Sequence, residues 1–382
     1  MLKPAFYTLS LLGTIAIWGR NVLDGSFARV FAAVNSESTY ILPGTKEPLL
    51  TSITGIRYPI DYQLGILILY FWEAVDGSHP ATSAVGIYFL GQYLSILTVM
   101  LTDSFRKGQV SGFGKAIAWT LLFQALAIGS SSGIWAALYT ASSPLVYRNL
   151  PLSSLQQASL ASPSSTLFLT PALAFGFIAP SIIMAIPSPS LVSNRFQQLA
   201  VVVWNVFPLL VFALHKTFSF LLPKRGFLKQ TSPISHLKAI RLTNAFVLAV
   251  SFAVHVAVSS LSLATVFFPA LFAPGYADEL SPASVFAPPI AIIQSKTTGE
   301  GLRSFLLWDQ VFGYSIMLIV ALMQLETVAK VKRKTFSWVK TIPLVLVGAV
   351  VAGPGSVCLV VSWVRDEILF DYGKDSVLAK TK

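Results

Sequence analysis

Carboxylic acids interrupt the apolar stretches of this sequence at a few places. The segment Arg57–Asp61 precedes an apolar run that ends in Glu73 and Asp76, and a later run contains Trp308 and Asp309. Two carboxyls that lie close together share a proton, and removal of water keeps that proton bound near neutral pH. A carboxyl in that state can act as a general acid, so these residues suggest acid-initiated chemistry.

Helical spacing gathers most of these acids on one side of a helix. At about 100° per residue, Asp61, Trp72, Glu73 and Asp76 fall within roughly a third of the circumference. Glu73 and Asp76 are one turn apart, whereas Asp61 lies about 22 Å further along the helix. The topology predicted below puts Asp309 at the depth of Glu73 and Asp76. We therefore predict a site built from these three carboxyls, with Asp61 as a second candidate.

A purely structural explanation is also open for these residues. Asp76 followed by Gly77 is typical of a solvated turn that ends a helix, and an acid such as Asp309 is favoured near a helix start. Gln92 is one of several polar residues in apolar runs, and most such residues bridge helices. Aromatic residues are plentiful, and most belong to packing or to membrane interfaces.

Several other chemistries have no signature in the sequence. We find no Cys/His spacing for a metal, no glycine-rich phosphate loop and no serine nucleophile elbow. The doubled aspartate-rich motifs that bind magnesium pyrophosphate in membrane prenyltransferases are also missing. We therefore expect neither a metal nor a cofactor.

Composition defines the class of structure that must position these residues. Hydrophobic residues make up 54% of the 382 residues and charged residues only 11%, whereas a soluble domain carries roughly 25% charged residues. The net charge of +11 lies in short clusters between apolar runs, which is typical of cytoplasmic loops in membrane proteins and not of a nucleic-acid binder. We predict an all-α, polytopic transmembrane helix bundle that forms one domain over residues 1–382.

A membrane helix needs about 20 mostly apolar residues, and nine runs approach that length. They are residues 4–18, 62–75, 82–102, 116–139, 167–186, 199–222, 242–272, 305–326 and 341–363. The basic loops 106–115, 224–241 and 330–340 should share the cytoplasmic face, which requires an even number of crossings between them. The run 167–186 contains Pro171 and Pro180, so we interpret it as re-entrant or interfacial. This leaves eight spans with both termini lumenal, and no internal repeat is evident.

Four short motifs carry a resemblance to a known family. They are RYPID at 57–61, WEAVDGSHP at 72–80, GQ at 91–92 and DSFR at 103–106. These motifs resemble the fungal integral membrane terpene cyclases of meroterpenoid pathways, of the ascofuranone cyclase type, with relatives in indole-diterpene gene clusters. The resemblance in motifs covers residues 57–106, and the rest of the chain matches in length and hydropathy.

The resemblance implies a reaction and a set of site residues. Such enzymes protonate an epoxide or an alkene of a prenylated aromatic or indole substrate, and ring closure then traps the carbocation, without a metal or cofactor. On this basis we expect Asp76 to be the acid with Glu73 as its partner, and Asp61, paired with Arg57, to be the second choice. Asp103 and Arg106 match the family pattern and are expected to form a structural pair on the cytoplasmic side. Substrate contacts are expected from the residues around these acids, namely Trp72, Arg57, Gln92 and Trp308.

The resemblance also implies a setting, and two other functions stay open. We expect a protein of the endoplasmic reticulum membrane that contacts lipid and a hydrophobic prenylated substrate, next to a pathway prenyltransferase and monooxygenases. One alternative is a transporter for a hydrophobic metabolite, which would use the same carboxyls as a proton relay. The other is a non-catalytic membrane partner of the pathway enzymes.

Overall fold

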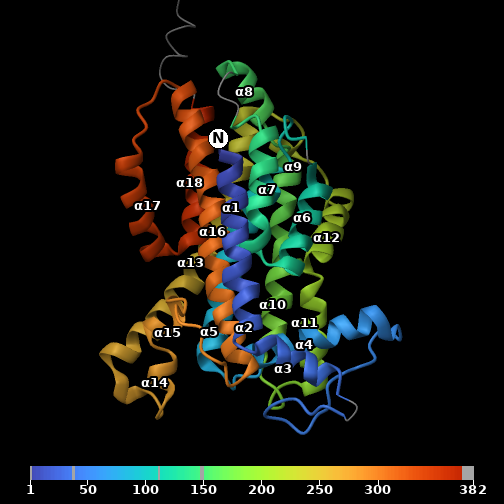
Figure 1. The fold of residues 1–382 in the computed structure, drawn as a ribbon. Helices are drawn as coiled ribbons and strands as arrows, with labels where there is room; N and C mark the ends of the chain where they lie inside the picture. The colour runs from blue at the N-terminus through green and yellow to red at the C-terminus, as the bar shows by residue number, and fades with distance from the viewer. Residues whose placement is uncertain (1, 37–38, 111, 147–149, 372–382) are drawn as a thin grey trace, which may run out of the picture.

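The computed structural model describes residues 2–36, 39–110, 112–146 and 150–371, and these fold into an elongated helix bundle (Figure 1). Within these ranges the elements are helices, and β-structure is limited to two isolated bridges. The prediction of an all-α fold is therefore confirmed. Aliphatic and aromatic side chains from most of the long helices form one continuous buried core.

The first part of the chain runs down one side of the bundle and then crosses beneath it. A continuous helix is formed by α1 (Leu2–Thr14), η1 (Ile15–Gly19) and α2 (Arg20–Leu23). The lower end of the molecule in Figure 1 then holds α3 (Ser26–Val34), η2 (Arg57–Asp61) and α4 (Tyr62–Val75). Gly25, with φ at 81°, makes the turn between α2 and α3, a conformation that costs glycine little.

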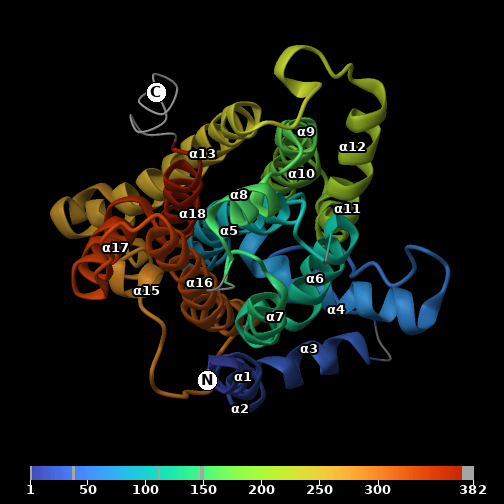
Figure 2. The same ribbon diagram turned by 90° about the horizontal axis from the view of Figure 1, so that it is seen from above.

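Helix α5 (Pro80–Asp103) lies at the centre of the bundle when it is seen from above (Figure 2). Within its most apolar window 83% of the residues are buried, against 28–61% in the other long apolar helices. It packs on α13 (Pro233–Phe267), α16 (Thr298–Val331) and α18 (Pro354–Phe370). Side chains from every direction therefore meet at α5.

Four helices of the described residues are long and apolar enough to cross a membrane. They are α5, α13, α16 and the continuous helix of α9 (Pro163–Leu173), η3 (Ala174–Ile178) and α10 (Ala179–Met184). A fifth results if α11 (Asn194–Asn205) and α12 (Phe207–Leu221), bent by 68°, count as one. The predicted number of eight spans is not confirmed. The proline-containing run predicted to be re-entrant or interfacial is instead one of the helices long enough to cross.

Two of the predicted spans are hairpins of two short helices. The run 116–139 forms α6 (Gly112–Leu126) and α7 (Ile128–Ser142), and the chain reverses at Ala127. Rings of Phe123 and Trp135, on either side of the break, are 6.5 Å apart, whereas a straight helix would separate them by about 18 Å. The run 341–363 likewise forms α17 (Trp338–Ala352) and α18, with the break at Gly353.

These hairpins give the two halves of the chain a common plan that the sequence does not show. Each follows a long helix, since α6 and α7 come after α5, and α17 and α18 come after α16. The break residues have similar backbone angles, φ 66° and ψ 145° at Ala127 and φ 90° and ψ 151° at Gly353. Because each hairpin returns to the end from which it started, it contributes no crossing.

The short helix α4 and the second hairpin also change where the ends of the chain lie. Figure 1 places the start of α1 at the upper end, together with the end of α18. The basic loops lie there too, since Lys332 Nζ donates to the Asp371 carbonyl at 2.8 Å and Arg106 pairs with Asp366. The prediction that both termini lie on the face opposite the basic loops is therefore wrong for the described residues, because the run 62–75 forms the short helix α4 at the lower end and the run 341–363 forms a hairpin.

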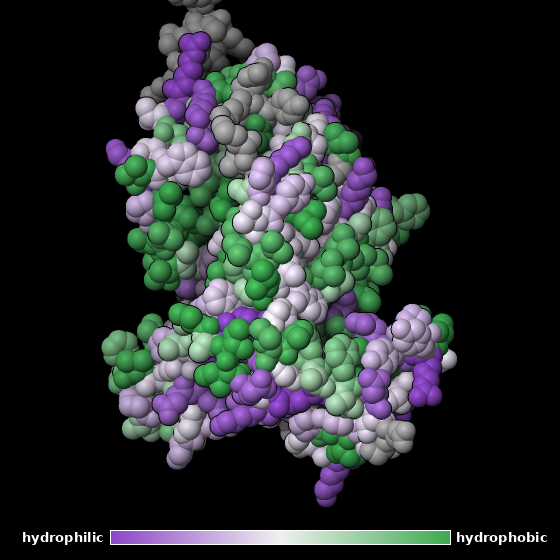
Figure 3. Space-filling view, in the orientation of Figure 1, coloured by the Kyte–Doolittle hydropathy of each residue, from purple (hydrophilic) through white to green (hydrophobic). Residues whose placement is uncertain are grey.

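Short helices and loops complete the two ends of the bundle. They are α8 (Leu152–Ser159), η4 (Gly226–Leu228), η5 (Pro269–Leu271), α14 (Tyr276–Glu279) and α15 (Pro282–Phe286). In the face drawn in Figure 3, hydrophobic side chains cover much of the middle of the molecule and hydrophilic ones gather toward its ends. This distribution suits a protein whose middle lies in lipid.

Candidate active site

A large apolar cavity lies in the lower half of the bundle, between α4, α5, α16 and the tip of the α6–α7 hairpin. Its volume is about 880 Å³, which lies in the usual range of about 300–1,000 Å³ for small-molecule sites. Two carboxyls line it, those of Asp76 and Asp309. The cavity therefore brings together two of the acids that the sequence analysis predicted.

Asp309 is the more enclosed of the two cavity acids. It is 3% exposed and lies in the first half of α16. The backbone N–H of Gly129, at the start of α7, donates to Asp309 Oδ1 at 2.5 Å. The hairpin tip thus fixes one carboxylate oxygen, and the side chains around the acid in the cavity are mostly apolar.

Asp76 follows the last residue of α4 and is half-buried. The backbone N–H and the hydroxyl of Ser78 both donate to Asp76 Oδ1, at 2.9 Å and 2.8 Å. Burial raises the pKa of the Asp76 carboxyl, against the hydrogen bonds from Ser78, which lower it. Asp76 therefore ends its helix, as the structural explanation expected, and also lines the cavity.

Aromatic side chains form much of the wall around these acids. Trp18, Phe27, Tyr70 and Phe305 make a connected group with ring centroids 5.3–5.8 Å apart. Phe71, which packs edge-on against Trp204, and Phe89 and Tyr93 from α5 also line the cavity. A cation that forms in this cavity would meet the electron-rich faces of several rings.

Glu73 and Trp72 lie outside the cavity, although they are neighbours of its lining. The backbone N–H of Gly299 donates a hydrogen bond to the buried carboxylate of Glu73, and His79 Nε2 lies 3.6 Å from the same oxygen. Glu73 therefore holds the first turn of α16, where a negative charge is favoured. The indole N–H of Trp72 donates to the Pro43 carbonyl at 3.0 Å, so Trp72 fixes the loop before α4.

Asp61 is buried at the start of α4, away from the cavity. It accepts hydrogen bonds from the backbone N–H of Thr54 at 2.8 Å and of Gly55 at 3.1 Å. The Thr54 N–H is the main cause that lowers the pKa of Asp61. Arg57 is exposed, and the ion pair expected between Arg57 and Asp61 is not formed.

The two remaining predicted contacts also point away from the cavity. Gln92 is buried in α5, where its amide donates to the Ser251 carbonyl and its oxygen accepts from the Ser356 N–H. The indole of Trp308 donates to the Pro289 carbonyl at 3.1 Å, and Arg20 lies over its ring. Neither residue lines the cavity. Adjacent residues of a helix diverge by about 100°, and here Asp309 points into the cavity while Trp308 points away from it.

The same periodicity identifies residues that the sequence analysis passed over. Phe305 is four residues before Asp309, which places both on one face of α16, and both line the cavity. Trp18 and Phe27 reach the cavity from α1–α3, far away in the sequence. The sequence contains no local signal for those two residues, because only the packing of the first helix against α16 brings them near.

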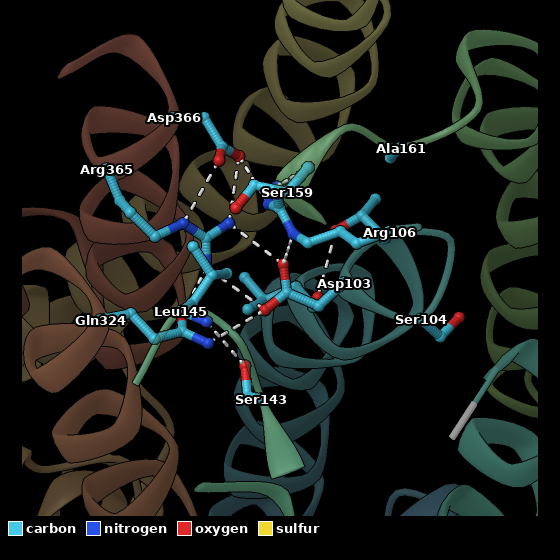
Figure 4. Close-up of polar contacts among 12 residues, drawn as sticks. Asp103, Ser104, Arg106, Ser143, Leu145, Ser159, Ala161, Gln324, Arg365 and Asp366 are labelled. Atoms are coloured by element: carbon cyan, nitrogen blue, oxygen red, sulfur yellow. Dashed lines mark hydrogen bonds and ion pairs between the residues drawn. The ribbon is translucent and has the colours of Figure 1, made fainter. Parts of the chain in front are cut away.

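A second group of charged residues is buried near the upper end of the bundle (Figure 4). Asp103 pairs with Arg106 at 2.7 Å and with Arg365 at 3.0 Å, and Asp366 pairs with both arginines. Tyr139 donates to Asp103 Oδ2 at 2.7 Å. The charges balance and all the carboxylates have donors, so this group joins α5, α7 and α18. The predicted pairing of Asp103 with Arg106 is confirmed as part of it.

The described residues contain no cluster of three His, Cys, Asp or Glu side chains that could hold a metal ion. Fold and site together define a class of protein. It is an all-helical bundle with several helices long enough to cross a membrane, and it encloses an aromatic cavity with two acids.

Comparisons with known proteins place the chain more closely. It is 28% identical over 325 residues to the terpene cyclase ctvD of Aspergillus terreus, covering 82% of this chain and 84% of that protein. It is 25% identical to the terpene cyclase penA of Penicillium crustosum, with 82% of each chain covered. The terpene cyclase sdgD of Emericella nidulans is 22% identical, with 96% of this chain and 95% of that one covered. No solved structure matches.

A family model, the CtvD domain, matches residues 2–370. The chain therefore belongs to the CtvD-domain family. This agrees with the resemblance drawn from residues 57–106 and extends it over nearly the whole chain.

Proposed function

We propose that this chain is a terpene cyclase that works in a membrane and starts its reaction by proton donation from Asp309. The observation that carries the proposal is the cavity of about 880 Å³, in which the buried carboxyl of Asp309 lies among aromatic side chains. The relatives named as terpene cyclases support the reaction class. Four described helices that are long and apolar enough to cross a membrane support the location.

The proposed reaction is a ring closure that leaves the mass of the substrate unchanged. Asp309 gives its proton to the oxygen of a terminal epoxide, one C–O bond breaks, and the electron-poor carbon forms a C–C bond with an alkene of the same molecule. In the variant of this reaction without an epoxide, an alkene carbon takes the proton. The last cation loses a proton, directly or after capture by a hydroxyl of the substrate, and that proton returns to the protein.

The cavity supplies what such a reaction needs. Ring faces of Trp18, Tyr70 and Phe305 stabilise positive charge on the substrate, and apolar walls exclude the water that would otherwise capture it. Asp76 is the second carboxyl of the cavity. We propose that it accepts the proton that the last cation loses. Glu73 supports the site from outside, because it holds the helix that carries Asp309.

A prenylated aromatic or indole compound fits the chemistry of the walls. The cavity has apolar side chains at its rim, where Val22, Phe31 and Ile87 are 64%, 44% and 49% exposed. In a membrane such a rim faces lipid, so a greasy substrate can enter sideways from the bilayer. We place the protein in the endoplasmic reticulum membrane. There a prenyltransferase would make the substrate and a monooxygenase would add the epoxide.

Microsomes from yeast that express only this chain test the proposal. They are incubated with epoxidised and non-epoxidised prenyl-aromatic and prenyl-indole compounds, and mass spectrometry with chromatography searches for new isomers of equal mass. We expect an isomer from at least one class of compound, absent from microsomes without the chain. If no isomer forms although the protein is folded and abundant, transport of such compounds or a non-catalytic role explains the cavity better.

A further inference from the structure

The tip of the α6–α7 hairpin has a backbone conformation that alanine rarely adopts. Ala127 has φ 66° and ψ 145°, close to a region that is populated almost entirely by glycine and costs other residues about 1–3 kcal/mol. Ala127 is nevertheless buried, at 5% exposed, and it lines the cavity next to Ile128. Such strain persists where the surroundings over-determine the conformation, and it clusters at functional sites.

The other hairpin provides an internal comparison. Its break residue is Gly353, with φ 90° and ψ 151°, and a Cβ there would lie 2.3 Å from Gln92 Oε1. Glycine therefore satisfies both the backbone and the packing at that tip, which does not line the cavity. The corresponding residue of the first hairpin is Ala127, which has a methyl group. The tip of that hairpin lines the cavity.

Both tips make the same kind of contact with the long helix of the other half. The Gly129 N–H, two residues after Ala127, donates to Asp309 of α16 at 2.5 Å. The Ser356 N–H, three residues after Gly353, donates to Gln92 of α5 at 3.1 Å. In both halves, a backbone N–H at or near a hairpin tip thus donates to a side chain of the other long helix. In the first half this side chain is the one that we assign as the acid.

The surroundings of the first tip leave it little freedom. The indole of Trp18 donates to the Leu126 carbonyl at 2.9 Å, and the Ala127 carbonyl accepts from the Ser131 N–H at 3.2 Å and from its hydroxyl at 2.6 Å. A Cβ on Gly129 would lie 3.1 Å from Asp309 Oδ1. The tip and the carboxyl are therefore in direct contact, and a shift of the tip shifts the acid.

We propose that Ala127 is a positioning and specificity-determining residue. Its constrained backbone presents the Gly129 N–H to Asp309, and its methyl group fills the cavity wall beside the carboxyl, where water would otherwise enter. The inference rests on the proposed cyclase reaction. If water enters, it captures the opened epoxide, giving a diol heavier than the substrate by one water molecule instead of the cyclised isomer.

The substitution Ala127→Gly separates this role from a role in folding. Glycine relieves the backbone strain, so we expect the variant to fold and to melt at the same temperature as the parent or higher. We expect its turnover to fall by about 10- to 100-fold with KM little changed, as for a misplaced catalytic group. The ratio of diol to cyclised isomer should rise at least about tenfold, equivalent to a change of about 1.4 kcal/mol between the two barriers.

Ala118→Gly is the matched control, because Ala118 is an exposed residue of α6 that does not line the cavity. Glycine there weakens a helix and should lower the melting temperature without changing the product ratio. The proposal is overturned if Ala127→Gly keeps the turnover and product ratio of the parent, or if it melts well below the parent, because a strained backbone at Ala127 predicts the opposite. Full activity of Asp309→Asn would instead contradict the proposed function.

Discussion

Asp309 and Asp76 line the same cavity but are held in different ways. Asp309 accepts a hydrogen bond from the Gly129 backbone of a neighbouring hairpin, whereas Asp76 accepts from Ser78, two residues away. Asp309 is also the more deeply buried of the two. A fixed position and a dry environment are what a proton donor to a hydrophobic substrate needs, so we assign proton donation to Asp309.

Asp76 gives a prediction about stability and pH. Because burial raises the pKa of Asp76 above 3.8, the folded protein binds this proton more tightly than the unfolded chain does. The stabilisation is complete below the unfolded pKa and is lost as the pH rises through the folded pKa. Asp76→Asn cannot ionise and can still accept the Ser78 hydrogen bonds. Its melting temperature relative to the parent should therefore increase between about pH 4 and about pH 7.

Thermal unfolding of the detergent-purified proteins at both pH values measures this difference. Glu47→Gln serves as the control, because Glu47 is exposed and does not line the cavity. A melting temperature for Asp76→Asn that changes with pH in parallel with that of the parent would show that burial does not perturb Asp76.

Some of the site could be predicted from single residues and some could not. Asp76 and Asp309 stand out because an acid in an apolar run is costly and needs a reason. The same argument selected Glu73. It cannot distinguish an acid that lines a cavity from an acid that accepts a hydrogen bond from the first turn of another helix. Gly299, the partner of Glu73, is far away in the sequence. Helical periodicity, applied to Asp309, would have pointed to Phe305.

At the scale of elements, the buried charges near the upper end lock the long helices to one another. Asp103 at the end of α5 contacts Arg106 and also Arg365 of α18, and the amide of Gln324 on α16 lies between Tyr139 and Arg365. Removing one partner of such a group leaves charge buried without compensation. The group therefore sets how α5, α16 and α18 pack, and through α16 it supports the cavity.

Asp103→Ala should cost about 3–5 kcal/mol of stability, because two buried arginines lose a carboxylate. The melting temperature in detergent and the amount of folded protein in microsomes measure the loss. Glu367→Ala is a matched control from the same end of the bundle, since Glu367 pairs with Arg241 at 2.6 Å but that arginine side chain is 55% exposed. Such surface pairs contribute about 0–1 kcal/mol. Equal losses of stability in the two variants would show that the buried charges do not hold the helices together more strongly than a surface pair does.

At the scale of the whole molecule, composition and hydropathy predicted the all-α class, and the spans were only partly predictable. A run such as 116–139 has the length and hydropathy of a crossing helix. Its reversal depends on one backbone angle at Ala127, in a residue type that gives no sign of a turn. Gly353 offers such a sign, but a glycine within a membrane helix is common. Counting the run 116–139 as a crossing led to the prediction that 167–186 does not cross. Counting the runs 62–75 and 341–363 as crossings placed the termini at the wrong end.

The arrangement predicts which parts of the chain share a side of the membrane. In a Cys358→Ser background, which has no other cysteine, single cysteines are introduced as Lys3→Cys, Val110→Cys, Lys334→Cys and Glu279→Cys. An impermeant maleimide added to sealed microsomes reaches one side of the membrane. It should therefore either label the first three variants and not Glu279→Cys, or label Glu279→Cys and none of the first three. Labelling of Lys3→Cys together with Glu279→Cys would support the topology that hydropathy suggested and contradict the placement of α4 at one end of the bundle.

The central claim is that a carboxyl in the cavity starts a cyclisation, and Asp309→Asn tests it most directly. Asparagine has nearly the same shape and can accept the Gly129 hydrogen bond, but it cannot donate an acidic proton. In the microsome assay we expect isomer formation to fall by about 100-fold or more, as for loss of a general acid, while Asp278→Asn, at an exposed site, stays at the level of the parent. Undiminished isomer formation by a folded Asp309→Asn protein would contradict the account.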